Sequence, residues 1–197
     1  MNPRRLAATV ALAAGLVACQ GGGQSPVEVV LTSPNSAVPP LTAFDVNWKD
    51  RLDQPYVFLE LVGDYTDARR QLPTLAQHAA AQGVRPSGPP FALFYDDPSR
   101  VPVEFCRARI CWPVATTAAV TGPLGYDVLA NETVVYGYVR GNYGQLDVAY
   151  PDIFEHMREG SWVLTGPIRE IYLVDPGSVQ TSAELVSELQ MPARPLY

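Results

Sequence analysis

Two stretches of the sequence, GPPFALFYDDP (Gly88–Pro98) and GPIREIYLVDP (Gly166–Pro176), are variants of one pattern that recurs after 78 residues. Each runs from a Gly-Pro turn through a short apolar strand to an Asp-Pro turn. Further pairs at this offset are Gly63 and Gly141, Tyr65 and Tyr143, Pro73 and Pro151, and His78 and His156. So many matches at one unbroken offset predict that the chain contains two copies of one unit.

Each copy is predicted to contain a strand, a helix and two further strands. The predicted strands are 56–62, 91–96 and 101–114 in the first copy and 133–140, 168–174 and 183–191 in the second. The helices begin near Pro73 and Pro151, since proline suits the first turn of a helix. Repeat one spans about 54–114 and repeat two about 132–192. This βαββ order predicts an α+β fold with antiparallel sheets, helices on one side, pseudo-twofold symmetry and a central ligand cleft.

The amino-terminal residues have the pattern of an export signal. Residues 1–18 combine two arginines with an apolar run that is too short to span a bilayer. The run ends in Leu16-Val17-Ala18-Cys19, which resembles a bacterial lipobox and predicts cleavage before Cys19 and lipid on its thiol. An ordinary secretory signal with an incidental cysteine is the alternative. Residues 19–45 are predicted to form the lipidated cysteine and a flexible tether, and 46–197 a single domain.

These features predict a protein of the cell envelope that a lipid anchor holds on the membrane. Gln20 follows the cysteine where an aspartate commonly signals inner-membrane retention, which favours the periplasmic face of the outer membrane. Cleavage removes Arg4 and Arg5, so the net charge changes from −6 to −8 and Lys49 is the only lysine. Such an acidic chain without a basic run argues against a nucleic-acid partner.

The second copy carries the features that resemble a known family. Gly-x-Tyr follows a strand, and Gly-Pro-x-x-Glu-x-Tyr precedes Asp-Pro. Together with the duplication, these motifs resemble the GyrI-like small-molecule-binding domain, the effector-binding domain of bacterial multidrug-responsive regulators, over about residues 50–197. The resemblance implies a cleft between two halves, where aromatic rings surround one acid that receives cationic, apolar ligands. That acid is Glu170 here. The sequence shows no helix-turn-helix signature, so the DNA-binding domain of the regulators is not expected here.

Strand periodicity gives a parallel prediction for Glu170. Alternate side chains of a strand share a face, so Glu170 and Tyr172 point one way, as do Ala92 and Phe94 in the first copy. The other face is more apolar and is expected to meet the helices. The same reasoning adds Phe58, Tyr136 and Tyr138, and Trp112 more weakly. The predicted ligand-binding residues are therefore Glu170, Tyr172, Phe94, Ala92, Phe58, Tyr136, Tyr138 and Trp112.

A carboxylate among aromatic rings suits one of two roles. It can attract a cationic ligand, for sequestration or sensing, or it can act as a general base. Some members of the family look like hydrolases of strained, cyclopropane-type molecules, so Glu170 is the catalytic residue if the chain is an enzyme. A module that binds another envelope protein is a third possibility.

The sequence predicts no metal, heme or other cofactor. His78 and His156 lack partners at the spacing of metal ligands. A disulfide between Cys106 and Cys111 stays open, because it needs a bend in a predicted strand. A non-enzymatic protein that binds a small hydrophobic or cationic molecule is the favoured interpretation.

Overall fold

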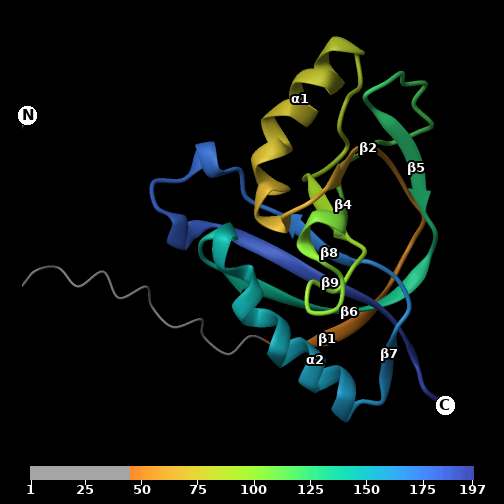
Figure 1. Ribbon diagram of the computed structural model, residues 1–197, viewed down its shortest axis with the longest axis vertical. Coiled ribbons are helices and arrows are strands. Elements are labelled where there is room, and N and C mark those ends of the chain that lie inside the picture. The colour runs from red at the N-terminus through yellow and green to blue at the C-terminus, as the bar shows by residue number, and fades with distance from the viewer. Residues whose placement is uncertain (1–44) are drawn as a thin grey trace, which may run out of the picture. The chain divides into compact units, whose positions relative to one another are not determined.

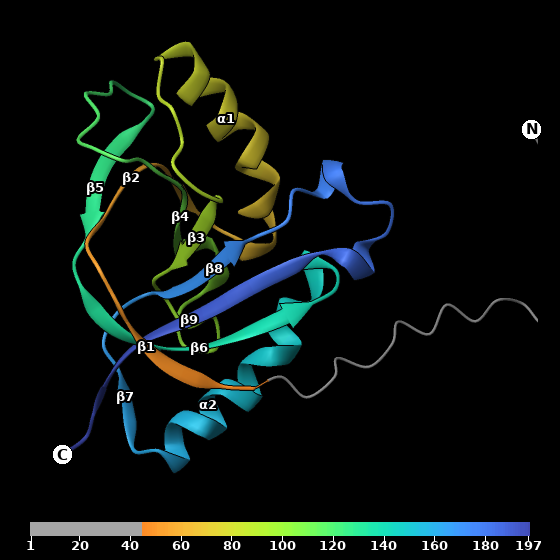
Figure 2. The same cartoon turned by 180° about the vertical axis from the view of Figure 1, so that it is seen from behind.

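The computed structural model describes residues 45–197, so the predicted signal, Cys19 and nearly all of the tether lie outside the described residues. Figures 1 and 2 show the arrangement from two sides. The strands are β1 Asn47–Arg51, β2 Gln54–Val62, β3 Phe91–Phe94, β4 Arg107–Pro113, β5 Gly125–Leu129, β6 Glu132–Arg140, β7 Trp162–Leu164, β8 Ile168–Tyr172 and β9 Val186–Pro195. The helices are α1 Leu72–Ala81 and α2 Tyr150–Glu159. Among these residues no helix is long and apolar enough to cross a membrane.

The strands form one antiparallel sheet in the order β1-β6-β9-β8-β3-β4-β2-β5, and β7 pairs with β9. β1 and β5 are the two edge strands of this order. Only two residues separate β1 from β2, and only two separate β5 from β6. Arg51 pairs with Glu132 and Gln54 with Leu129, so the two pairs of strands form one long ribbon. The sheet must therefore curl toward itself, as Figure 2 shows.

β3 and β8 are the central pair of strands in the sheet. They belong to the two similar stretches of the repeat, 88–98 and 166–176. Ala92 lies directly opposite Glu170 in this pair. The row continues through Ile110 on β4 and Leu189 on β9. Because directly opposed residues share a face of the sheet, all four side chains are on one side.

Both helices cover the side of the sheet that holds Glu170. Leu75 of α1 and Ile153 of α2 are fully buried in one core cluster with Ala92 and Leu189. Pro73 and Pro151 lie in the first turns of their helices, as the sequence predicts. The α+β class, the antiparallel sheet and the common side of the helices agree with the sequence.

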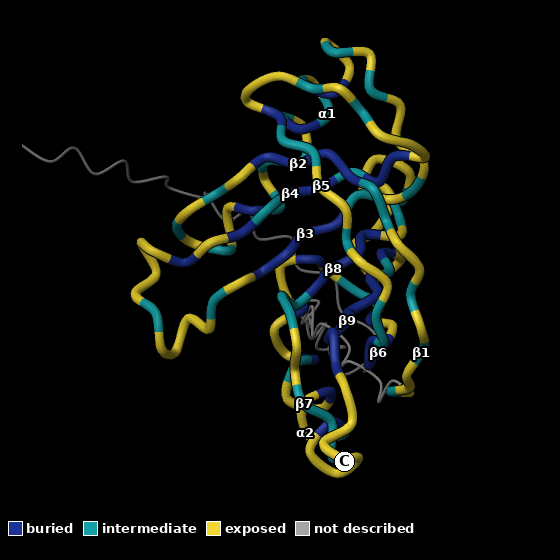
Figure 3. The backbone as a smooth tube through the Cα atoms, turned by 90° about the vertical axis from the view of Figure 1, so that its right-hand side faces the viewer, coloured by how far each residue is buried: buried dark blue, intermediate teal, exposed yellow. Residues whose placement is uncertain are grey.

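The prediction of which face meets the helices is wrong. Phe91, Leu93 and Ile171 were expected beneath the helices, but they form a second cluster on the opposite face with Tyr56 and other apolar side chains. Alternation identifies which residues share a face but not what covers each face. The curled sheet buries both faces of its middle strands, which Figure 3 shows as the dark blue segments of β3, β8 and β9.

The segment from 101 to 129 differs from the sequence prediction in two places, and it also contains the two cysteines whose pairing the sequence leaves open. The segment predicted as a strand from 101 starts with a short 3-10 turn, Val103–Phe105, and β4 begins only at Arg107. Cys106 and Cys111 are both buried free thiols. Residues 115–129 lie between the two predicted copies, and part of this segment forms β5, which extends the ribbon with β2.

The same local contacts occur at corresponding places in the two halves. The Tyr65 hydroxyl donates to the carbonyl oxygens of Asp96 and Arg107, each at 3.0 Å. The Tyr143 hydroxyl donates to those of Val174 at 2.6 Å and Val186 at 3.1 Å. The residues that precede each tyrosine by two, Gly63 and Gly141, have φ angles of 130° and 127°, which suit glycine.

Candidate functional site

Glu170 lies in the middle of β8, under the helices. Its exposed fraction is 1%. β8 is flanked by β3 and β9, so its backbone is fully paired and the carboxylate projects directly from the centre of the sheet. A charged group at such a place is costly unless other groups compensate it.

Four hydrogen-bond donor atoms on three residues surround the Glu170 carboxylate. Arg69 belongs to the 3-10 turn η2, Arg69–Gln71, and its Nε and Nη2 donate to Oε2 and Oε1 at 3.0 and 2.8 Å. The Tyr172 hydroxyl donates to Oε2 at 2.8 Å and the Tyr150 hydroxyl to Oε1 at 2.5 Å. Both carboxylate oxygens are thus engaged, and the two-pronged arginine contact is the strongest type of ion pair.

The surroundings keep the two phenols protonated. Burial, and then the charge of Glu170, raise the pKa of Tyr150 and the pKa of Tyr172 far above the ordinary value. Burial, the largest single cause, acts to lower the pKa of Arg69, but the charge and hydrogen bonds of Glu170 together with Tyr172 and Tyr150 outweigh it, and the net shift is upward. The cluster therefore holds one carboxylate, one guanidinium and two neutral hydroxyls.

Four of the predicted site residues share the face and core cluster of Glu170. Ala92 is opposite the carboxylate and adds no bulk there. The Phe94 ring packs on Tyr65 with centroids 4.6 Å apart, and Tyr172 contacts Glu170 directly. Trp112 packs against the same cluster and donates its indole N–H to the Gly88 carbonyl at 3.0 Å, so it lines the periphery.

Phe58, Tyr136 and Tyr138 do not share a site with Glu170, which corrects the sequence prediction. Phe58 lies opposite Cys111 and belongs to the second cluster, together with Phe91. Tyr136 and Tyr138 flank Gly137, and Gly137 is the residue of β6 in the row of Glu170 and Leu189. Their two rings therefore face away from the helices.

Arg69 and Tyr150 are functional candidates that the sequence reasoning missed. Neither lies in a strand, and the alternation argument therefore does not reach them. The offset of 78 does provide a signal, since it aligns Arg69 with Asp147 and Tyr150 with Leu72. At both positions the side chains of the two copies differ in charge or polarity, as they do at Ala92 and Glu170.

Two cavities lie away from Glu170. One of about 240 Å³ opens on the opposite face of the sheet. Another of about 230 Å³ lies beside Gly63 and Tyr65. Neither is lined by Glu170, because Arg69 and Tyr150 fill the place beside its carboxylate. Within residues 45–197, no three His, Cys, Asp or Glu side chains gather as a metal ion would require.

The model of the family described as GyrI-like small molecule binding domain matches residues 45–194. None of the curated proteins compared with the chain is significantly similar to it. Among solved structures, the EcmrR C-terminal domain has a TM-score of 0.68 at 20% identity, with 78% of this chain and 99% of that domain covered. EcmrR in its complex with DNA has a TM-score of 0.70 at 20% identity to this chain. The match covers 78% of this chain but only 58% of the EcmrR chain.

Two more distant structures share the fold. SAV2435 bound to tetraphenylphosphonium has a TM-score of 0.53 at 13% identity, with 77% of this chain and 95% of that chain covered. A hydrolase encoded by lin2189 from Listeria innocua has a TM-score of 0.53 at 12% identity, with 76% and 91% covered. At these identities the likeness concerns the fold alone.

Proposed function

The chain belongs to the GyrI-like small molecule binding domain family, and we propose that it binds amphipathic aromatic or cationic small molecules at Glu170, for sequestration or sensing. The observation that carries this proposal is the burial of a single carboxylate at the seam of the two halves, against an arginine from a short turn. Ala92 at the corresponding place indicates that the fold does not need a charge there.

Arg69 acts in this proposal as an internal stand-in for the cation of a ligand. Its side chain is 20% exposed, against 2% for that of Glu170, so the guanidinium lies on the solvent side of the pair. The three-residue turn η2 joins β2 to α1 without a place in the sheet. A ligand cation that displaces Arg69 exchanges one ion pair for another, while the released guanidinium regains water. The free-energy cost of removing the Glu170 carboxylate from water is already included in folding, so a ligand does not add this cost when it binds.

Aromatic rings next to the carboxylate suit an aromatic cation. Tyr172 donates to Glu170 and packs on Tyr143 with ring centroids 5.0 Å apart, and Phe94 packs on Tyr65 in the same way on the other side of the seam. Ring faces attract cations by about 0.5 to 2 kcal/mol per contact. SAV2435, which shares the fold, was solved with tetraphenylphosphonium, a cation that carries four phenyl rings.

Binding is favoured over hydrolysis by the state of the carboxylate. A general base needs an oxygen that can reach the proton of a water molecule. Both oxygens of Glu170 instead accept hydrogen bonds from Arg69, Tyr150 and Tyr172. The likeness to a hydrolase from Listeria innocua at 12% identity concerns the fold and does not change this balance.

A calorimetric titration of the purified protein with tetraphenylphosphonium tests the proposal. Glu170→Gln should weaken binding by about tenfold or more, equivalent to 1.4 kcal/mol, because it removes the negative charge but keeps the size. Glu155→Gln is the matched control, since Glu155 is exposed on α2 and pairs only with Arg158. Equal affinity of the Glu170→Gln variant and the unaltered protein would refute the role of the charge.

We extend the proposal to the envelope role and to the repeat. A lipid on Cys19 would hold the domain at a membrane surface through the tether, and the support for this is the lipobox pattern. Cys19→Ser should then move the protein from the membrane fraction to the soluble fraction of cells, and unchanged membrane association would contradict the anchor.

The recurring contacts of Tyr65 and Tyr143 support the view that the halves are copies of one βαββ unit with pseudo-twofold symmetry.

A further inference from the structure

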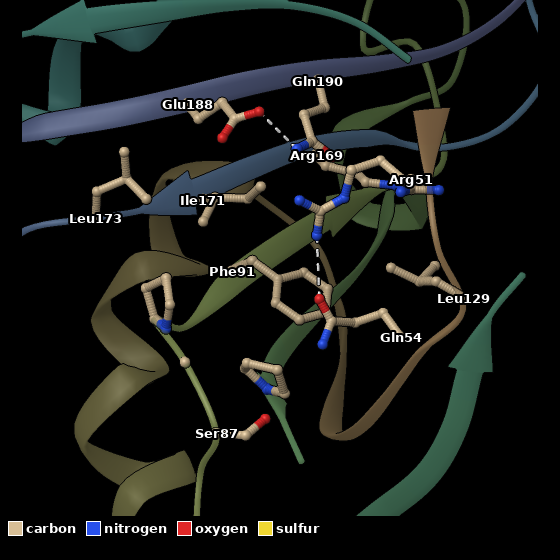
Figure 4. A pocket seen from close by; sticks show the side chains of 13 residues that line it. Arg51, Gln54, Ser87, Phe91, Leu129, Arg169, Ile171, Leu173, Glu188 and Gln190 are labelled. Carbon is tan, nitrogen blue, oxygen red and sulfur yellow. Dashed lines mark hydrogen bonds between the residues drawn. The ribbon is translucent and has the colours of Figure 1, made fainter. Parts of the chain in front are cut away.

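The cavity of about 240 Å³ on the face away from the helices has its own chemistry. It lies between the bend of the ribbon and the middle of the sheet, as Figure 4 shows. At about 30 Å³ per water molecule, it has room for a molecule the size of a substituted benzene ring. Its lining residues include Arg51, Gln54, Phe91, Leu129, Arg169, Ile171, Glu188 and Gln190.

The charged groups in and around this cavity leave one positive charge without a counterion. Arg169, only 3% exposed, pairs with Glu132. Glu188 pairs with Lys49 and also accepts from Gln190 Nε2 at 2.7 Å. Arg51 donates only to the neutral amide oxygen of Gln54, at 3.1 Å, and forms no ion pair within the described part of the chain.

Two buried polar atoms of the lining also have no hydrogen-bond partner within residues 45–197. They are Nε of Arg169, a donor, and Oε1 of Gln190, an acceptor. Gln190 is completely buried, and the two residues are directly opposite each other in the pairing of β8 with β9. A buried polar atom without a partner costs free energy, so each is expected to meet one from outside the chain.

We propose that this cavity is a second ligand site, which binds a small monocarboxylic acid with an apolar body and a hydroxyl group. The carboxylate of the acid accepts from Arg51 and from Nε of Arg169, and so provides the missing negative charge. The hydroxyl donates to Oε1 of Gln190. The apolar body lies against Phe91 and Ile171, which are buried on the same face.

The second site is independent of the site at Glu170. Arg169 and Glu170 are adjacent in β8, so their side chains point to opposite faces of the sheet. The Glu170 site presents a carboxylate and suits cations. The second site presents an uncompensated guanidinium and suits anions, and the two sites can therefore be tested separately.

Calorimetric titration of the purified full chain with the three isomers of hydroxybenzoate tests the second site. At least one isomer should bind saturably, more tightly than benzoate and much more tightly than the corresponding hydroxybenzamide, which lacks the charge. Arg51→Gln should weaken binding by about tenfold or more. Arg140→Gln, which removes an equal charge from an exposed residue at the end of β6, should leave the affinity unchanged.

Three results would overturn the proposal. They are the absence of saturable binding for all isomers, equal affinity for hydroxybenzoate and hydroxybenzamide, and equal affinity of the Arg51→Gln variant and the unaltered protein. The comparison of the acid with its amide uses the unaltered chain, so it remains decisive even if Arg51→Gln impairs folding. Saturating tetraphenylphosphonium should leave hydroxybenzoate affinity unchanged, and competition between the two ligands would assign the acid to the Glu170 site instead.

Discussion

The two halves of the domain share a backbone frame, and they differ in chemistry where they meet. In both, a glycine with positive φ precedes a tyrosine whose hydroxyl joins two backbone carbonyl groups. At the seam, however, Ala92 of the first half faces Glu170 of the second. The shared residues hold the backbone, whereas the residues that differ supply the chemistry.

The differences between the halves converge on one cluster. Relative to its counterpart 78 residues earlier, Tyr172 adds a hydroxyl to Phe94, and Tyr150 replaces Leu72. Both hydroxyls donate to Glu170. The fourth member, Arg69, comes from the first half, so the cluster needs both halves.

Making the halves alike at the seam is expected to have the largest effect on stability. Glu170→Ala leaves the guanidinium of Arg69 and two phenols without their acceptor, and should lower the free energy of unfolding by about 3 kcal/mol. Denaturant unfolding measures this change. Arg69→Ala combined with Glu170→Ala should cost less than the sum of the two single changes, and strict additivity would contradict a direct pairing.

The shared glycines should prove equivalent. Gly63→Ala and Gly141→Ala each put a side chain at a φ angle near 130°, where no atom lies within 4 Å of the new methyl group. The cost is then backbone strain alone, about 1–3 kcal/mol. Both variants should lose the same stability within about 0.5 kcal/mol. Denaturant unfolding measures both losses. A clear difference between them would contradict the equivalence of the two turns.

The shared tyrosines should show a smaller, similar effect. Tyr65→Phe and Tyr143→Phe each remove a hydroxyl that donates to carbonyl groups and accepts from the N–H of Asp96 or Val174. Each change should cost about 1 kcal/mol. Tyr143 is the more deeply buried of the two, so its variant should be the less stable in thermal unfolding.

A pH-dependent effect is expected at alkaline pH. Burial, the largest cause, raises the pKa of Tyr65 to about 12, from about 10 in an unfolded chain. The folded protein thus holds this proton more tightly, and its contribution to stability is full below pH 10 and is lost as the pH rises toward 12. Thermal unfolding should show a smaller alkaline loss for Tyr65→Phe than for the unaltered protein. An identical loss would contradict the shifted pKa.

The sequence predicted the fold class, and it grouped half of the candidate site residues on the correct face, for reasons that are local. Gly-Pro and Asp-Pro turns locate β3 and β8, and alternation places Ala92, Phe94, Glu170 and Tyr172 on one face. Alternation does not reveal the curl of the sheet, which buries both faces of β8. The helices were therefore assigned to the wrong face, and Phe58, Tyr136 and Tyr138 to the wrong site.

Arg69 could not be predicted by the same means, because its position depends on how a three-residue turn meets the opposite half of the chain. The ribbon was missed for a similar reason. β1 and β5 are short, and only their pairing with β6 and β2 identifies them as its continuation. The position of Arg69 and the pairing of the ribbon thus depend on contacts between residues far apart in the sequence, which local patterns do not reveal.

The affinity of an Arg69→Gln variant for tetraphenylphosphonium tests the central claim most directly. If Arg69 stands in for a ligand's cation, its removal frees the Glu170 carboxylate, and the variant should bind at least several-fold more tightly than the unaltered protein. Arg70→Gln is the matched control, since the neighbouring Arg70 is exposed and pairs only with Asp67. Unchanged or weaker binding by a folded Arg69→Gln variant would contradict the account.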